Sequence, residues 1–143
     1  MKIKCFKFGG QGEGEPKFPL RAHYNDSGAD CFAAERAVIP AGGIAKVRTG
    51  VGVEIPDGYD MCIHCKSGLA SKGIWAANCP IDSGYRGEIY AVLMNAGGDD
   101  YVFEEGDKVG QFVVRPVVYA EFCGDPAAEG GERGAGGFGS TGR

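Results

Sequence analysis

The chain of 143 residues, 43% of them hydrophobic, is long enough for one domain with a single core. Its formal net charge of -4 argues against a nucleic-acid duplex as the main partner, because such sites need a basic face, but a small anionic ligand remains possible. No apolar run reaches membrane-spanning length and residues 1–5 do not resemble a signal peptide, so we expect a cytoplasmic protein with no membrane partner.

The first half of the chain predicts a series of short strands. Residues 2–8 predict an opening strand, which a Gly-rich loop at 9–15 follows. Four further apolar stretches, separated by Gly and Pro, lie at 37–39, 44–48, 51–55 and 59–65. Strands at such short and regular spacing favour an all-β sandwich or barrel.

One helix is predicted, over residues 67–77, and it is expected to be short because Gly68 and Gly73 weaken it. Residues 78–88 predict a hairpin, with a turn at Ser83-Gly84 between two strands.

The remaining strands follow the hairpin. Residues 89–94 are apolar on both faces, which predicts a central strand, and 95–100 predict a turn. The last strands are expected at 102–103 and 109–122, with Pro116 at an edge or a bulge.

The chain changes character at Gly124, which divides it into a barrel domain at 1–123 and a tail at 124–143. Eight of the last twenty residues are Gly, and such a tail cannot fold by itself. It is either a disordered end or a flexible lid that closes over a ligand. The lid interpretation is favoured by Arg133, Phe138 and the pair Ser140-Thr141, which stand between glycines.

Six cysteines include a pair with the CxxC spacing, Cys62 and Cys65, which is typical of zinc or redox sites. The pair lies in a predicted strand, where residues three apart point to opposite faces and cannot bind one ion. We therefore interpret the cysteines as small thiols in a reducing compartment.

The hairpin carries the candidate catalytic group. A carboxylate on a rigid turn, here Asp82, can orient and deprotonate a water molecule, and Tyr85 three residues later can form a flat wall for a ring. Taken alone, the stretch is more typical of an ordinary turn with a solvated Asp.

Two further stretches suggest anion binding. Lys66, Ser67 and Gly68 offer a cation, a hydroxyl and a free N–H at a helix start, which suits a phosphate, although Ser67 is equally suited to cap the helix. Gly28 is expected to allow an unusual backbone angle beside Asp30.

Five motifs in order together resemble the trimeric dUTPases, from about residue 20 to the C-terminus. They are Ser27-Gly28-Ala29-Asp30, Ser67-Gly68-Leu69-Ala70, Asn78 to Glu88, Gly106 to Gln111, and Arg133 to Gly142. The resemblance implies a jelly-roll-like β-barrel of the β-clip type and hydrolysis of dUTP to dUMP and pyrophosphate. This reaction limits uracil in DNA and supplies dUMP for thymidylate synthesis. The resemblance also implies a homotrimer whose sites combine the hairpin of one subunit, the phosphate motifs of a second and the tail of a third.

The resemblance implies roles for the residues of the hairpin. Asp82 would activate the water that attacks the α-phosphorus and would contact the sugar 3′-hydroxyl. The segment Asn78, Cys79, Pro80 and Ile81 would read uracil through its backbone. Because Tyr85 lies on the same tight turn as Asp82, we also expect its ring to pack flat against the sugar and to select deoxyribose.

Lys66, Ser67, Gly68 and Gln111 would contact the phosphates. In the tail, Phe138 would stack on uracil. The γ-phosphate end of the nucleotide would be contacted by Arg133, Gly139, Ser140 and Thr141.

The metal implied by the resemblance is Mg²⁺, held by the triphosphate and its waters with no direct protein ligand. Asp30 would lie near these waters, or would serve only to stabilise a turn. The chain departs from the family in having Lys at 66 and 108, where Arg is usual, and in Cys79 and Pro80. Asp107 is expected to pair with Arg86.

Two alternatives to a dUTPase share the expected fold. One is dCTP deaminase, which needs a glutamate acid/base, for which Glu88 is the nearest candidate. The other is a nucleotide-sensing or protein-binding jelly roll without turnover, against which the intact Asp82 argues.

Overall fold

The computed structural model describes residues 1–9 and 14–124. This part of the chain forms one short helix and a succession of strands, which confirms the predicted all-β class. The elements are β1 (Lys4–Lys7), β2 (Ala29–Phe32), β3 (Ala37–Ile39), β4 (Ile44–Arg48), β5 (Val51–Glu54), β6 (Tyr59–His64), α1 (Ser67–Ala70), β7 (Ile74–Ala76), β8 (Pro80–Ile81), β9 (Tyr90–Asn95), β10 (Tyr101–Phe103) and β11 (Lys108–Pro116).

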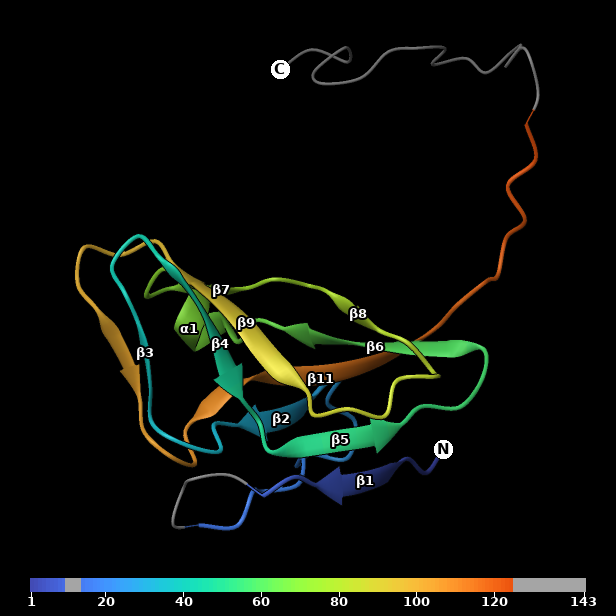
Figure 1. Cartoon of the computed structure of the whole chain (residues 1–143), viewed down its shortest axis with the longest axis horizontal. Coiled ribbons are helices and arrows are strands. Elements are labelled where there is room, and N and C mark those ends of the chain that lie inside the picture. Colours follow the sequence, from blue (N-terminus) through green and yellow to red (C-terminus); the bar gives the residue numbers. More distant parts are fainter. Residues whose placement is uncertain (10–13, 125–143) are drawn as a thin grey trace.

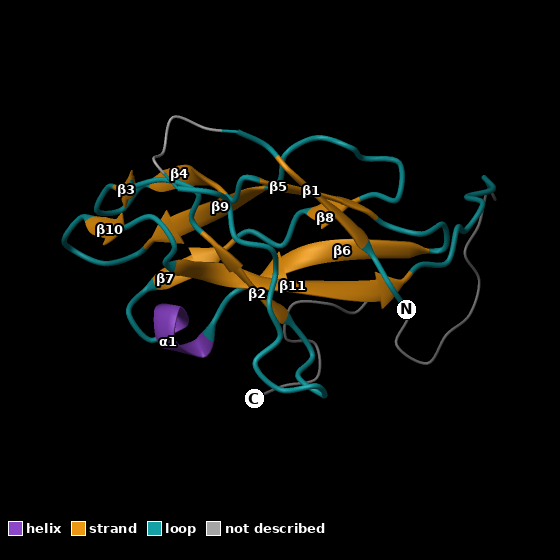
Figure 2. Ribbon diagram, turned by 90° about the horizontal axis from the view of Figure 1, so that it is seen from below, coloured by secondary structure: helices purple, strands orange, loops and turns teal. Residues whose placement is uncertain are grey.

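The strands pair antiparallel and mostly with partners distant in the sequence (Figure 1). A four-stranded sheet has the order β2-β11-β6-β8, and a three-stranded sheet has the order β4-β9-β7. Two further pairs, β1 with β5 and β10 with β3, extend the structure. In Figure 2, β4 and β9 lie in one layer and β6 and β11 in the other. This arrangement is the jelly-roll-like one that the sequence predicts.

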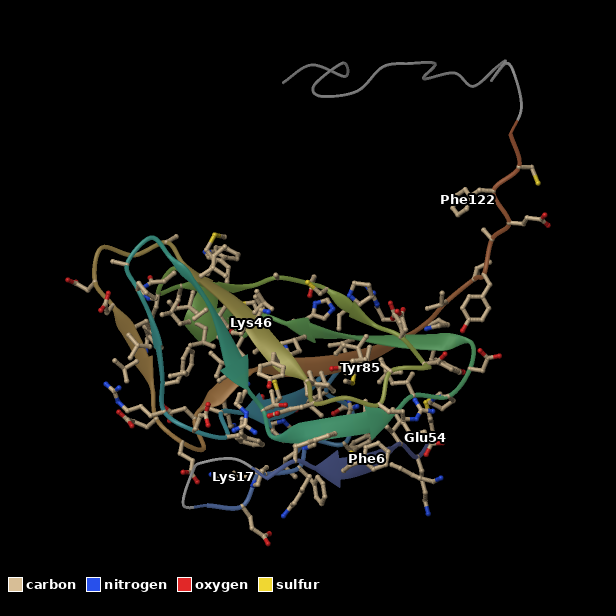
Figure 3. All side chains as sticks on the ribbon, in the orientation of Figure 1. Phe6, Lys17, Lys46, Glu54, Tyr85 and Phe122 are labelled. Atoms are coloured by element: carbon tan, nitrogen blue, oxygen red, sulfur yellow. The ribbon has the colours of Figure 1, made fainter. Side chains whose placement is uncertain are left out.

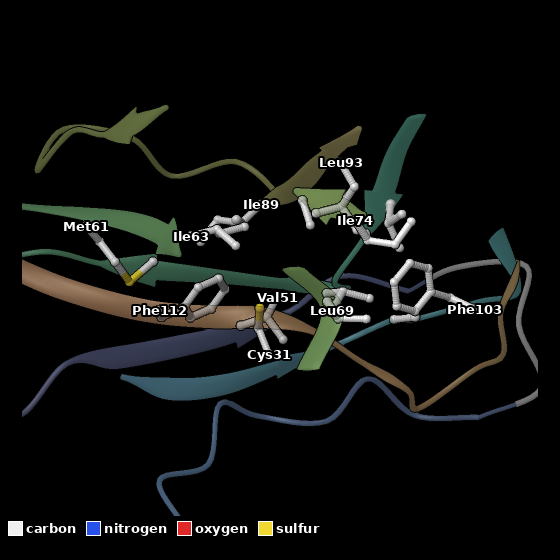
Figure 4. Packing of buried hydrophobic residues seen from close by; sticks show 14 of the residues in the cluster. Cys31, Val51, Met61, Ile63, Leu69, Ile74, Ile89, Leu93, Phe103 and Phe112 are labelled. Atoms are coloured by element: carbon white, nitrogen blue, oxygen red, sulfur yellow. The ribbon is translucent and has the colours of Figure 1, made fainter. Parts of the chain in front are cut away.

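The core lies between the two layers and is built by strand alternation (Figure 4). In β9, Ala91 and Leu93 are buried while Tyr90 and Met94 are exposed, because successive side chains of a strand point to opposite faces. The largest buried side chains include Phe103, Ile39, Ile55, Met61, Ile74 and Leu93.

The predicted helix is much shorter in the structure. It ends at Ala70, and the second half of the predicted span, Ile74–Ala76, is strand β7. Gly73 has a φ of 81°, a left-handed conformation that a helix cannot continue through. The N-cap is Lys66, with no side-chain capping bond, so the alternative interpretation of Ser67 as the cap is wrong.

The predicted hairpin at 78–88 is also wrong as a pair of neighbouring strands. β8 pairs with β6, whereas β9 pairs with β4 and β7, so the two flanking strands belong to different sheets. What remains is a tight turn in which the N–H of Tyr85 donates to the carbonyl of Asp82 at 3.0 Å. The central position predicted for the next strand is confirmed, because β9 lies between β4 and β7.

The last strand ends earlier than predicted. β11 is central, between β2 and β6, and stops at Pro116, which lacks the N–H needed to continue the ladder. Residues 117–122 are not a strand, and Phe122 is 97% exposed on the segment that leaves the barrel (Figure 3). Across residues 1–9 and 14–124, no helix has the length and apolarity needed to cross a membrane.

Candidate functional site

A cavity of about 650 Å³ opens beside the turn that follows β8. This volume suits a small-molecule ligand. The lining residues come from β4, β6, the segment between β7 and β8, β8 itself, the turn between β8 and β9, and β9: Lys46, Ile63, Ala77, Cys79, Pro80, Ile81, Asp82, Tyr85, Glu88, Ile89, Tyr90 and Val92. Five predicted site residues are thereby brought together, and the predicted Asn78 is exposed beside the cavity without lining it.

Tyr85 lines the cavity, and both its ring hydroxyl and its backbone N–H are hydrogen-bonded. Its hydroxyl donates to the carbonyl of Glu88 at 2.8 Å, and its N–H closes the turn to Asp82. A Cβ at Gly87 would lie 2.6 Å from the Tyr85 ring carbon Cζ, so only glycine lets the ring lie across this position. Asp82 is exposed at the same wall, where water can reach its carboxylate.

The predicted phosphate-binding residues occupy a different surface. Register places Gln111 of β11 opposite Asp30 of β2 and opposite His64 of β6, so these three form one row across the larger sheet. Asp30 forms ion pairs with Lys66 and with Lys108, the latter at 2.7 Å. Burial acts to raise the pKa of Asp30, but hydrogen bonds from the two lysines outweigh it and hold the pKa below its ordinary 3.8.

Gly28 does not have the unusual backbone angle that the sequence suggests, since its φ is not in the left-handed region. Its role is steric: a Cβ at this position would lie 2.8 Å from the Cβ of Gln111. Gln111 is further anchored by donating from Nε2 to the carbonyl of Cys65 at 3.4 Å. The close approach of the Gln111 side chain is therefore what requires glycine at position 28.

Ser67 and Gly68 are exposed at the start of α1. Neither they nor Lys66, Asp30 or Gln111 line the cavity at Asp82. Within the described part of one chain, the base-and-sugar side and the phosphate side of the predicted site thus remain apart.

Asp107 does not pair with Arg86, so that prediction is wrong. The carboxylate of Asp107 accepts the N–H of Glu104 at 2.8 Å and closes its own turn. Arg86 donates to the carbonyl of Tyr85 at 2.9 Å and lies 3.8 Å from Glu54. Each side chain forms a hydrogen bond with the backbone of its own turn, and the two turns lie in different parts of the sequence, at 83–86 and at 104–107.

Glu88, the candidate acid/base of a deaminase, is engaged elsewhere. Its carboxylate accepts from Arg48 at 3.1 Å, from the N–H of Gly50 at 2.9 Å and from the Tyr90 hydroxyl at 3.2 Å. The hydrogen bond to Glu88 is the main cause that raises the pKa of Arg48. The Glu88 carboxylate is therefore committed to hydrogen bonds within the chain.

Sequence reasoning missed several lining residues, among them Lys46, Tyr90 and Val92. Strand alternation places Lys46 on the outer face of β4 and Tyr90 and Val92 on that of β9, but it does not indicate a cavity there. It also missed His64, whose Nε2 is buried with no hydrogen-bond partner among the described residues.

Cys62 and Cys65 face different surroundings. The Sγ of Cys62 lies 3.0 Å from Nη2 of Arg115, and the Sγ of Cys65 lies 3.1 Å from the carbonyl of Ile74. All six cysteines are free. In the described ranges, no group of three or more His, Cys, Asp or Glu side chains is placed to hold a metal ion. The tail residues Arg133, Phe138, Gly139, Ser140 and Thr141 lie outside the described residues.

The fold and the cavity define an all-β barrel protein that presents an acidic turn at a ligand-sized pocket. Residues 15–142 match the family model described as dUTPase, and the chain belongs to the dUTPase family. It is 44% identical over 147 residues to the deoxyuridine 5′-triphosphate nucleotidohydrolase of Anaplasma marginale, with 99% of each chain covered.

Solved structures agree with this assignment. The dUTPase of Staphylococcus bacteriophage 80alpha with dUPNHPP superposes with a TM-score of 0.88 at 26% identity, covering 99% of both chains. A mutant dUTPase from phage phi11 of S. aureus, described with a structural Mg(II) ion, has a TM-score of 0.78 at 25% identity and covers 89% of this chain and 98% of its own.

Proposed function

We propose that this chain hydrolyses dUTP to dUMP and pyrophosphate. The observation that carries the proposal is that Asp82 and Tyr85 of one family motif line the same ligand-sized cavity. A carboxylate and an aromatic wall at one site suit a reaction in which a nucleoside is positioned and a water molecule attacks its phosphate.

Asp82 is the proposed base. It accepts a proton from a water molecule as the water oxygen bonds to the α-phosphorus, and the bond from that phosphorus to the bridging oxygen breaks. Pyrophosphate leaves with the bonding electrons, and dUMP remains with its 3′-hydroxyl near the same carboxylate. The exposure of Asp82 at the cavity wall supports this role.

The segment 78–81 is proposed to read uracil. The N–H of Cys79 donates to the carbonyl of Ala77 at 2.9 Å, and Pro80 has no N–H, so two donors are not available to the base. A backbone carbonyl of this segment accepts the N3–H of uracil, a proton that cytosine lacks. Ile81 supplies an apolar surface beside the ring.

Cations and donors on β11 and at the start of α1 are proposed to hold the triphosphate. Lys66 and Lys108 present two ammonium groups around Asp30, and Gln111, Ser67 and Gly68 add neutral donors nearby. Positioning and charge neutralisation supply most of the catalysis expected for phosphoryl transfer.

Magnesium fits the phosphate side as a cation carried by the triphosphate. Mg²⁺ keeps several waters and is held by few protein groups, and Asp30 is the carboxylate placed among the phosphate-binding candidates. Asp30 would hold the ion through its waters. When bound, the ion neutralises triphosphate charge.

A homotrimer with shared sites is the proposed assembly. Its support is the separation, in one chain, of the cavity from the phosphate-binding residues. A row of exposed apolar side chains also crosses the outer face of the smaller sheet, where Met94 lies between Ile44 and Trp75. Ile44 is 66% exposed, Trp75 49% and Met94 46%. Such a patch is suited to a subunit contact. The tail, with Arg133, Phe138, Gly139, Ser140 and Thr141, is proposed to close over the ligand of a neighbouring subunit.

The test is to incubate the purified chain with dUTP, dCTP and UTP, each with magnesium, and to follow pyrophosphate, nucleoside monophosphate and ammonia. We expect dUMP and pyrophosphate from dUTP. Ammonia from dCTP would indicate a deaminase instead, and binding of dUTP without products would indicate a sensor.

A further inference from the structure

We propose that Arg48 is a positioning residue for the nucleotide site: through Glu88 it holds the ring of Tyr85 and thereby sets the preference for deoxyribose over ribose. The role in sugar selection rests on the proposed function. Arg48 does not line the cavity itself, so its influence is indirect.

Arg48 ends β4 and its guanidinium bridges two carboxylates. Its Nε lies 3.1 Å from Oε1 of Glu88, its Nη2 lies 3.1 Å from Oε2 of the same residue, and its Nη1 lies 2.9 Å from Glu35. The side chains of Arg48 and Glu88 are only 18% and 11% exposed. A two-pronged pair sheltered from solvent is better ordered than an exposed pair, which is often worth little.

Three more hydrogen bonds join the same two segments. The N–H of Gly50 donates to Oε1 of Glu88 at 2.9 Å, the hydroxyl of Thr49 donates to the carbonyl of Ile89 at 2.6 Å, and the N–H of Ile89 donates to the carbonyl of Val51 at 2.9 Å. We call residues 48–51 together with 88–89 the corner clasp. The clasp fixes the backbone of Glu88 where the chain enters β9.

That backbone is what holds Tyr85. The carbonyl of Glu88 accepts the hydroxyl of Tyr85 at 2.8 Å, and Tyr85 is otherwise 45% exposed at the cavity wall. If the clasp loosens, the acceptor shifts and the ring loses its fixed tilt against the sugar. A flat ring at C2′ excludes a hydroxyl only while it stays in contact, so ribose becomes better tolerated.

The test compares Arg48→Met and Arg48→Lys with wild type, using kcat/KM for dUTP and for UTP at one magnesium concentration. Arg48→Met is expected to lower the dUTP-to-UTP ratio about tenfold, because small misplacements of a positioning group have large effects on rate. Lysine keeps the charge without the planar fork, so Arg48→Lys should recover part of the ratio. Tyr85→Phe, which removes the hydroxyl and keeps the ring, should move the ratio in the same direction as Arg48→Met.

Arg115→Met is the matched control. Arg115 also forms a two-pronged pair, at 3.1 and 2.7 Å with Asp60, but on the other sheet. Its loss should lower thermal stability and leave the ratio unchanged. A folded Arg48→Met protein with the wild-type ratio would overturn the role in sugar selection. If Arg48→Met does not fold, Arg48→Lys is compared with wild type instead. A dUTP-to-UTP ratio in Arg48→Lys equal to that of wild type would then contradict the proposal.

Hydrogen exchange without nucleotide tests the clasp independently of activity. The amides of Tyr85 and Ile89 should exchange about tenfold faster in Arg48→Met and at the wild-type rate in Arg115→Met. Unchanged exchange would refute the clasp. Should the wild type fail to hydrolyse dUTP, the proposed function and the role in sugar choice fail together, while the exchange result alone decides whether Arg48 holds Tyr85.

Discussion

Asp82 is the single residue on which the proposed chemistry depends most. Asp82→Asn keeps the size and polarity of the side chain but removes the base. We expect kcat to fall about a hundredfold or more, the range typical of a lost general base, while dUTP still binds. Steady-state kinetics and equilibrium binding on the purified variant measure both effects. A variant with near-normal turnover would show that another group activates the water.

The ionisation of Asp30 makes the stability of the fold depend on pH. Because Lys108 and Lys66 hold the pKa of Asp30 below its ordinary 3.8, the unfolded chain binds the proton more tightly than the folded one. The stabilisation from the carboxylate is therefore complete above pH 3.8 and is lost as the pH falls through the folded-state pKa.

Asp30→Asn should accordingly lower Tm at pH 7, and the difference from wild type should shrink as the pH falls below 3.8. Thermal melts at several pH values measure this. Asp99→Asn, which removes an exposed carboxylate in the 96–100 turn, is the control and should leave Tm at pH 7 nearly unchanged. A Tm difference for Asp30→Asn that stays constant with pH would contradict the prediction.

At the scale of elements, the contact between β2 and β11 places Gln111. Gly28→Ala would bring a methyl group to 2.8 Å from the Cβ of Gln111 and force the strands or the side chain to move. We expect stability to fall by about 1–3 kcal/mol, as for other overpacking changes, and kcat/KM for dUTP to fall as well. Gly98→Ala is the matched control, since nothing lies within 4 Å of the added methyl. Wild-type kinetics in Gly28→Ala would show that the position of Gln111 does not matter.

At the scale of the whole molecule, the separation of the two halves of the site predicts complementation between chains. Asp82→Asn and Lys66→Ala proteins should each be nearly inactive alone. When they are unfolded together and refolded, mixed trimers contain some sites with both residues intact, so activity should rise above that of either parent. Light scattering should report three times the 15.0 kDa chain mass. Activity no higher than the average of the parents would place the whole site in one chain.

The tail is a second feature of the whole molecule. Deleting 131–143 should leave the melting temperature almost unchanged, because the buried hydrophobic residues in the described part of the chain run from position 31 to position 112, and should leave the oligomeric mass unaltered. Turnover of dUTP should fall strongly, because the proposed lid and its Arg133 and Phe138 are lost. A truncated protein that hydrolyses dUTP as well as the full chain would show that these residues are dispensable.

Much of the strand plan and the chemistry could be predicted from local sequence. The strands at 37–39 and 44–48 were predicted with the bounds observed, because Gly and Pro between apolar stretches mark where strands stop. Local sequence also offers Asp82 and Tyr85 as candidates, since a carboxylate and an aromatic ring three residues apart on a turn are visible without a fold. The stretch alone is more typical of an ordinary turn, and it is the order of the five motifs that makes these two residues site candidates.

Only the tertiary structure decided which strands pair and what surrounds the turn. The flanking strands β8 and β9 belong to different sheets. The cavity is completed by Lys46 of β4 and Val92 of β9. Arg48 reaches Glu88 across 40 residues of sequence. The physical reason is that local patterns determine the extended conformation and the face of each side chain, whereas partners are selected by packing of the whole core and by hydrogen bonds between distant segments.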